Sequence, residues 1–131
     1  MTGYGMHEQT FMTLVATSPF KDPAGHSVVC YLVDRNRSVI GYNQPIIDTS
    51  DLWLHAEMNA VLKYQQFKFI DEFEVITAYI NRPPCSYCLR TMKFSFPNIS
   101  IELYTDECIK QFTREARELQ VPFRLHKGIK L

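Results

Sequence analysis

Apolar and polar positions follow two different spacings along the chain, and the strand-like spacing occurs in five places. Continuous or alternating runs of β-branched and aromatic residues predict strands at 27–33, 38–43, 73–80, 99–104 and 121–126. The first two runs flank the short polar segment 34–37, so we expect them to form an antiparallel hairpin. Pro122 places the last strand at an edge of the sheet, because proline cannot donate a ladder hydrogen bond.

Apolar residues at helix-like spacing occur before the first strand and between later strands. It predicts four helices, which run from Met6 to about Thr17, over Leu54–Tyr64, within 81–95 and within 105–120. Pro97 is expected to stop the third helix. In the second helix, Met58, Val61 and Leu62 are expected to form the buried stripe. In the fourth, Thr105 or Asp106 is expected to cap a helix that carries Ile109, Phe112, Ala116 and Leu119 at near-helical intervals.

The order of these elements predicts an α/β fold. Residues 105–120 between the last two strands are enough for the helical crossover that a parallel pair requires. We therefore expect a three-layer α/β/α architecture, in which a mixed five-stranded sheet has helices on both faces and strands 4 and 5 are parallel. Because no repeat, low-complexity tract or linker divides the chain, residues 1–131 are predicted to form a single domain.

Composition and charge narrow the function classes. The chain is 46% hydrophobic and 21% charged, which is typical of a globular protein. Its 14 basic and 14 acidic residues cancel, so it lacks the strongly basic footprint of a general nucleic-acid binder. A basic segment followed by an apolar run is missing at Met1, and no stretch of about 18 apolar residues occurs. We expect a cytoplasmic protein without a membrane partner.

Metal-ligating residue types stand at the starts of two predicted helices, His55 at one and Cys85 and Cys88 at the other. Cysteines three apart share one helix face, and the positive helix end favours the thiolate that a metal needs. Pro84 suits the first turn of that helix, where its missing N–H costs nothing. Three ligands without an obvious fourth are typical of a catalytic zinc site that leaves one position for water. We predict one Zn²⁺ per chain, with Glu57 beside it to carry protons.

Each part of this pattern has a simpler interpretation when taken alone. His55 by itself is typical of a capping or surface histidine, and a lone C-x-x-C pair is also typical of a redox site. Cys30 and Cys108 stand singly and are expected to be core or surface thiols. Trp53 is a candidate to line a substrate pocket by stacking on a planar ring, although aromatic residues near strand ends often serve packing alone. The basic stretch 124–131 either contacts a phosphate or RNA or is solvated.

The motif residues resemble a known family. His55-Ala56-Glu57, followed later by Pro84-Cys85-Ser86-Tyr87-Cys88, resembles the H-x-E and P-C-x-x-C signature of the zinc nucleobase deaminases. From about Ser27 to His126 the order of strands and helices is also similar to the cytidine deaminase fold. The histidine ligand and the helix between the last two strands are similar to the deoxycytidylate, tRNA-adenosine and nucleic-acid cytosine deaminases.

The resemblance implies roles for individual positions. It implies a hydrolytic deamination at C4 of cytosine or C6 of adenine, in which zinc activates a water molecule and Glu57 carries the protons. The family's pattern puts the backbone amide of Ala56 against the base and the carbonyl of Pro83 against the exocyclic amine. Asn43, which ends the Gly41-Tyr42-Asn43 segment, matches the residue that usually holds the sugar.

The substrate is suggested by two motifs that point to different relatives. The segment HAEMNAVL is most similar to deoxycytidylate deaminases, whereas GYNQPI is also similar to tRNA-adenosine deaminases, which usually carry glutamate where Pro83 stands here. Zero net charge favours a small nucleotide over a polyanion. We predict deamination of a dCMP- or CMP-type nucleotide by a homo-oligomer. The alternatives are a deaminase of cytosine or adenine within DNA or tRNA, and a catalytically silent zinc-binding module, against which the presence of Glu57 argues.

Overall fold

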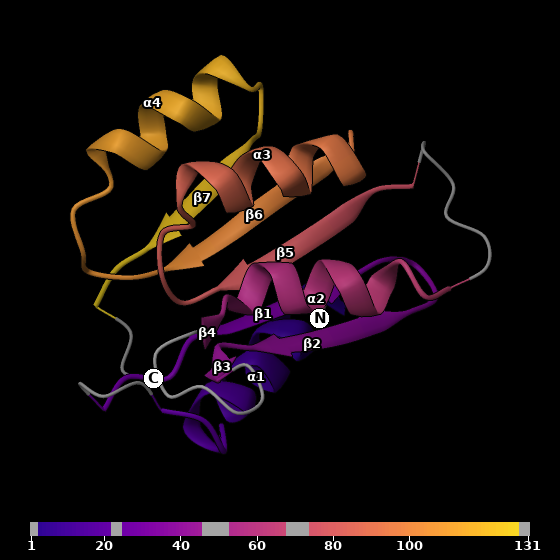
Figure 1. Cartoon of the computed structure of the whole chain (residues 1–131), viewed down its shortest axis with the longest axis vertical. Helices are drawn as coiled ribbons and strands as arrows, with labels where there is room; N and C mark the ends of the chain where they lie inside the picture. Colours follow the sequence, from indigo (N-terminus) through magenta and orange to yellow (C-terminus); the bar gives the residue numbers. More distant parts are fainter. Residues whose placement is uncertain (1–2, 22–24, 46–52, 68–73, 129–131) are drawn as a thin grey trace.

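A five-stranded sheet forms the centre of the protein, with its strands in the order β2-β1-β5-β6-β7 (Figure 1). The computed structural model describes residues 3–21, 25–45, 53–67 and 74–128. The strands are β1 (Val29–Val33), β2 (Ser38–Tyr42), β3 (Gln44–Pro45), β4 (Trp53–Leu54), β5 (Ile76–Ile80), β6 (Ile99–Tyr104) and β7 (Phe123–His126). The helices are α1 (Gly3–Ala16), α2 (Ala56–Tyr64), α3 (Ser86–Ser95) and α4 (Lys110–Glu118).

The sheet is mixed, as the sequence predicts. Strand β1 pairs antiparallel with both β2 and β5, so the expected hairpin is present. Strands β6 and β7, the fourth and fifth of the sheet along the chain, are parallel, and β5 is parallel to β6 as well. Both parallel connections carry a helix, α3 and α4, which returns the chain to the same end of the sheet. The carboxyl ends of β5, β6 and β7 therefore share one edge.

Helices cover both faces of the sheet and make the three predicted layers. Along β1, Cys30 and Leu32 pack in the core shared with α2, α3 and α4, while Tyr31 belongs to the cluster around Phe11 of α1. All five β1 residues are buried, which confirms that this strand is covered on both sides. In Figure 1, α2, α3 and α4 lie in front of the sheet and α1 lies behind it.

Helix α2 lies unusually close to β2, and Gly41 makes this approach possible. A Cβ atom at position 41 would meet the Ala56 carbonyl oxygen and would lie 2.5 Å from the amide nitrogen and 2.9 Å from the Cβ of Ala60. Such distances to helix backbone cannot be relieved by rotating a side chain, so glycine is needed here for space.

Substitution of Gly41 should therefore destabilise the fold. We expect Gly41→Ala to lower the free energy of unfolding by about 3 kcal/mol or more, because the helix that begins beside His55 must move away from β2. Chemical denaturation measures the change. Ser38→Ala is the matched control, since Ser38 is exposed on the same strand and should change stability by less than about 0.5 kcal/mol. Equal stability of the two variants would contradict the close approach.

The buried face of α2 differs from the predicted stripe. Val61 is buried, but Leu62 is 49% exposed and Met58 is only partly buried, so the stripe was wrong at these two positions. The core-facing row instead runs through Ala56, Ala60 and Tyr64 at four-residue spacing. The physical reason is the short distance to β2, which selects small alanine side chains where the apolar pattern favours larger ones.

Element boundaries also differ at the fourth helix and at some strand ends. Helix α4 begins at Lys110, and neither predicted cap residue caps it. Thr105 Oγ1 instead accepts a hydrogen bond from the Glu107 amide at 3.1 Å, and Asp106 Oδ1 accepts one from the Gly128 amide at 2.8 Å. These bonds hold the chain in a turn for several residues after β6. The first, second, third and fifth predicted strands are longer than the observed β1, β2, β5 and β7, and Phe73 lies outside the described residues.

Other local predictions hold, and one local pairing was missed. Helix α3 ends before Pro97, and Pro122 lies beside the edge strand β7 with its carbonyl accepting a hydrogen bond from Ile101 at 3.0 Å. Residues 44–53 were expected to be a loop and Leu54 to begin the second helix, but this segment contains the two-residue antiparallel pair β3–β4, which brings its ends together. Within the described ranges, every helix is too short or too polar to cross a lipid bilayer.

Candidate metal and active site

The candidate site lies at the edge of the sheet where α2 and α3 begin. Asn43 follows β2 there, Val28 precedes β1, and the segment 81–85 follows β5. These ends meet because β2 and β5 both run antiparallel to the strand between them. The side chain of Asn81 fixes the segment after β5 to β1, since its Oδ1 accepts from the Val29 amide and its Nδ2 donates to the Ser27 carbonyl, both at 2.8 Å.

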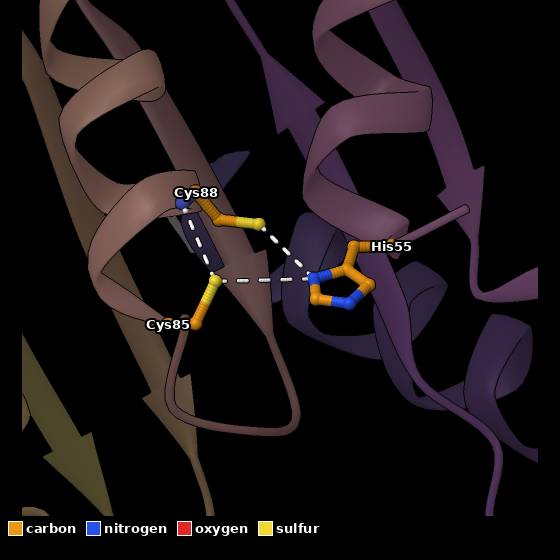
Figure 2. Close-up of side chains that lie close together, drawn as sticks. All are labelled: His55, Cys85 and Cys88. Carbon is orange, nitrogen blue, oxygen red and sulfur yellow. Dashed lines mark hydrogen bonds between the residues drawn. The ribbon is translucent and has the colours of Figure 1, made fainter. Parts of the chain in front are cut away.

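Three potential metal ligands converge between the two helices (Figure 2). The Nδ1 atom of His55 lies 3.3 Å from the Cys88 sulfur and 3.9 Å from the Cys85 sulfur. All three ligand atoms lie within 4.8 Å of one another. A tetrahedral zinc ion with ordinary bond lengths requires nitrogen and sulfur ligands about 3.6 Å apart. The spacing of the three side chains therefore fits Zn²⁺ without a change of fold.

The helix starts explain why these side chains meet. His55 is the N-cap residue of α2 with an extended backbone (φ −62°, ψ 145°), and its ring makes no capping hydrogen bond. Instead the ring points toward α3. Cys85 is the N-cap residue of α3, and its sulfur accepts a hydrogen bond from the Cys88 amide at 3.4 Å. Pro84 precedes this cap, so its predicted place in the first helical turn was wrong, because the helix begins only at Ser86.

Burial shapes the electrostatics of the site. Burial raises the pKa of the Glu57 carboxyl, and its own backbone amide, His55, Cys88 and Arg82 offset this only in part. Burial also raises the pKa of the Cys88 thiol, and the neighbouring Glu57 charge and the contact with Cys85 raise it further. The Glu57 carboxyl and the Cys88 thiol, which are anionic when deprotonated, thus share a poorly solvated environment. A divalent cation compensates such a donor set, and the two thiols and one imidazole are ligands that zinc prefers.

A cavity of about 360 Å³ opens beside the potential ligands. Its lining consists of Val28, Asn43, His55, Ala56, Glu57, Arg82, Pro83 and Cys85. It thus brings together most of the positions singled out from the sequence, while Cys88 is buried beneath them. The backbone of Trp53 belongs to β4, but its side chain lies outside the described part of the chain, so its stacking role is not tested.

Sequence reasoning missed two residues of this lining, Val28 and Arg82. Val28 lies within an apolar run whose pattern indicates only core packing. Arg82 stands three residues before Cys85 in a loop, and a single loop arginine has no distinctive sequence signal. A prediction that the carboxyl ends of β2 and β5 meet beside the start of β1 would have been needed to find both.

Asn59 supports the segment that carries Asn43. Its side chain is 5% exposed and its Nδ2 donates to the Tyr42 carbonyl at 3.1 Å and to Gln44 Oε1 at 3.2 Å. The backbone amide of Asn43 itself donates to the Val28 carbonyl at 3.0 Å. The chain is therefore held on both sides of Asn43 by a residue one turn after His55 on α2.

Removal of this amide should loosen the segment. We expect Asn59→Leu to lower the free energy of unfolding by about 1–3 kcal/mol, because the Tyr42 carbonyl loses its side-chain partner in a buried place. Urea titration measures the difference. Gln65→Leu is the control, since Gln65 lies at the end of the same helix, is exposed, and its side chain donates a long hydrogen bond of 3.4 Å to Ser95. A loss no larger than that of the control would contradict the supporting role.

Among the described residues, the other two cysteines and the basic C-terminal residues are not part of the ligand cluster. Cys30 is fully buried, and burial together with the nearby Glu57 and Cys88 raises the pKa of its thiol, which suits a neutral core residue. Cys108 is exposed. In the basic C-terminal stretch, Arg124 and His126 contact the buried Glu102 at 2.6 Å and 3.2 Å, so these two belong to the packing of β6 and β7.

Comparison with solved structures finds proteins of similar fold. The dCMP deaminase of cyanophage S-TIM5 in complex with dCMP and dUMP has a similar fold, with a TM-score of 0.72 and 15% identity over 93% of this chain and 95% of the phage chain. Its apo form gives a TM-score of 0.72 and 14% identity over 98% and 100%. The C-terminal deletion mutant of Aspergillus oryzae Rib2 deaminase gives 0.62 and 11% over 93% and 84%.

These likenesses establish the fold, and the sequence itself establishes the family. No match was found among curated protein sequences. The family model of the cytidine and deoxycytidylate deaminase zinc-binding region matches residues 6–99, a span that contains the histidine, the glutamate and both cysteines of the motif. The chain therefore belongs to the cytidine and deoxycytidylate deaminase family that this zinc-binding region defines.

Proposed function

We propose that this protein is a zinc-dependent deaminase that converts a cytosine mononucleotide of the dCMP or CMP type into the uracil nucleotide and ammonia. The observation that carries the proposal is the buried Glu57 in the lining of a cavity that also contains His55 and Cys85. Membership of the deaminase family supports the reaction class. A nucleotide substrate is supported by the similar fold of a phage enzyme that was solved with dCMP and dUMP.

We assign the metal to His55, Cys85 and Cys88, which would hold one Zn²⁺ per chain. When bound there, zinc would lower the pKa of a water molecule, which could then lose a proton at neutral pH and become nucleophilic enough to attack C4 of cytosine. Glu57 takes a proton from that water and gives it to the ring nitrogen, then transfers the second to the departing amine. The water oxygen replaces the exocyclic nitrogen on C4, and the products are the uracil ring and ammonia. Burial of Glu57 keeps bulk water away from these transfers.

The base and the sugar would be held by the walls of the cavity. We assign the Ala56 amide and the Pro83 carbonyl to the base, with the carbonyl accepting from the exocyclic amine, and Asn43 to the sugar. All three residues line the cavity, and Ala56 is buried at 1% exposure. The cavity volume of about 360 Å³ lies at the small end of the range for ligand pockets, which suits a mononucleotide.

The sequence also allowed two other functions, and the lining of the cavity argues against both. A deaminase of DNA or tRNA would need several basic phosphate contacts, whereas Arg82 is the only Lys or Arg side chain in the described lining of the cavity. A silent zinc module would have no use for the buried carboxylate beside the ligands. Zinc occupancy, the single domain and the homo-oligomer remain predictions.

Ammonia release tests the proposed function. The zinc-loaded protein is incubated with dCMP, CMP, deoxycytidine, single-stranded DNA containing cytosine, and tRNA. We expect ammonia from the mononucleotides in preference to the two nucleic acids. Faster release from DNA or tRNA would favour the nucleic-acid alternative, and no release from any substrate while zinc is bound would favour the silent module.

A further inference from the structure

Arg82 lies at the open side of the active-site cavity. Its side chain is 49% exposed, whereas Ala56 and Glu57 in the same lining are 1% and 4% exposed. The cavity therefore runs from a buried end near Glu57 to a half-exposed cationic group. A ligand that fills it can place an uncharged ring at the inner end and a charged group beside the arginine.

The loop that carries Arg82 is fixed in the fold. Asn81, the residue before it, is held by two hydrogen bonds of 2.8 Å to the backbone at Ser27 and Val29. Pro83 follows and restricts the backbone on the other side. The position of Arg82 relative to the cavity is thus fixed by β1 and β5. An arginine on an unanchored surface loop would lack such a fixed position.

The guanidinium of Arg82 is available for an anion. In the part of the chain that the structure describes, its recorded ion pair joins Nε to Glu107 Oε2 at 3.5 Å. Both side chains of this pair are about half exposed, so the pair contributes little to stability. The pair uses Nε, and the planar fork of an arginine can still offer its terminal nitrogens to two oxygens of a phosphate.

Arg82 is the only Lys or Arg side chain in the lining formed by described residues, so an anionic group on a ligand meets one permanently charged partner there. We propose that Arg82 binds the 5′-phosphate of the substrate and makes the enzyme select the nucleotide over the nucleoside. This assignment rests on the proposed deaminase function and adds the group that sets its substrate class.

Paired kinetic measurements test the assignment. We expect Arg82→Ala to lower kcat/KM for dCMP by about 10- to 100-fold, mainly through KM, because one charge-assisted contact to the phosphate is lost. For deoxycytidine, which has no phosphate, kcat/KM should stay within about twofold. Arg90→Ala is the matched control, since Arg90 is exposed on α3 outside the cavity lining, and it should change neither value.

Equal losses on both substrates, or no loss on dCMP, would overturn the assignment. A DNA oligonucleotide with one internal cytosine is tested as a third substrate. If it is deaminated faster than dCMP, and Arg82→Ala slows this reaction, the assignment of Arg82 to the phosphate of a mononucleotide would be overturned. A binding experiment tests the assignment without measuring catalysis. In calorimetry of the zinc-loaded protein, we expect dUMP to bind more tightly than deoxyuridine, and we expect Arg82→Ala to remove this difference in affinity. If the wild-type protein releases no ammonia but binds dUMP more tightly than deoxyuridine in a way that depends on Arg82, the proposed function fails while the phosphate site stands.

Discussion

Glu57→Gln is expected to lower the rate of deamination by about 10²- to 10⁴-fold while the protein keeps its zinc and its fold. The substitution retains the size of a buried side chain that is 4% exposed but removes its ability to take and return a proton. The loss should appear in kcat, because proton transfer occurs in the chemical step and not in the binding of the nucleotide. Steady-state ammonia release and metal content measured on the same preparation give both quantities.

Glu118→Gln provides the control for this substitution, since Glu118 is exposed on α4, away from the cavity. It makes the same chemical change and should leave the rate unchanged. A Glu57→Gln protein that binds zinc and still deaminates at the wild-type rate would exclude Glu57 as the proton carrier. A protein that has lost its zinc would instead indicate that the carboxylate helps to hold the metal.

His55→Ala should abolish both zinc binding and activity. One of the three ligands is removed, and because the loss of an outer-shell partner alone costs about 10- to 100-fold in metal affinity, loss of a ligand should cost more than 100-fold. The chain should still fold, since His55 is exposed and makes no capping hydrogen bond. Zinc titration and thermal unfolding measure the effect. Because zinc binds the folded wild-type protein, added zinc should raise its melting temperature by mass action, whereas the melting temperature of the variant should not change.

The control for the ligand variant is His26→Ala, an exposed histidine of the segment before β1. It should keep the zinc content, the activity and the rise in melting temperature on zinc addition. Zinc binding of wild-type strength by His55→Ala would show that the two cysteines hold the metal without the imidazole, and the proposed ligand set would then be wrong.

The general architecture could be predicted because each strand has a strong local signal. The apolar run at 27–33 indicates a strand covered on both faces, and residues 105–120 are long enough for the helical crossover of a parallel pair, so the mixed sheet follows from local patterns. The buried stripe of α2 could not be predicted in this way. Its orientation depends on the close approach of Gly41 to Ala60, a tertiary contact between residues from two elements.

The site shows the same division between local and tertiary information. His55, Glu57, Cys85 and Cys88 were found because their spacing forms a motif, and the structure places the three ligand atoms within 4.8 Å. Arg82 was missed because its place in the cavity lining arises where the carboxyl ends of β2 and β5 meet beside the start of β1, which no local spacing encodes. The residues proposed to bind the metal thus carry a sequence signature, whereas Arg82 and Val28 join the cavity lining only through the topology.

Metal content and ammonia release from dCMP, measured together on the full chain, test the central claim most directly. Wild-type protein is predicted to contain about one zinc ion per chain and to release ammonia in step with the formation of dUMP. The Glu57→Gln protein is predicted to contain the same zinc and to release ammonia at least about 100-fold more slowly. A wild-type protein that holds stoichiometric zinc but leaves dCMP and the other cytosine substrates unchanged would contradict the account.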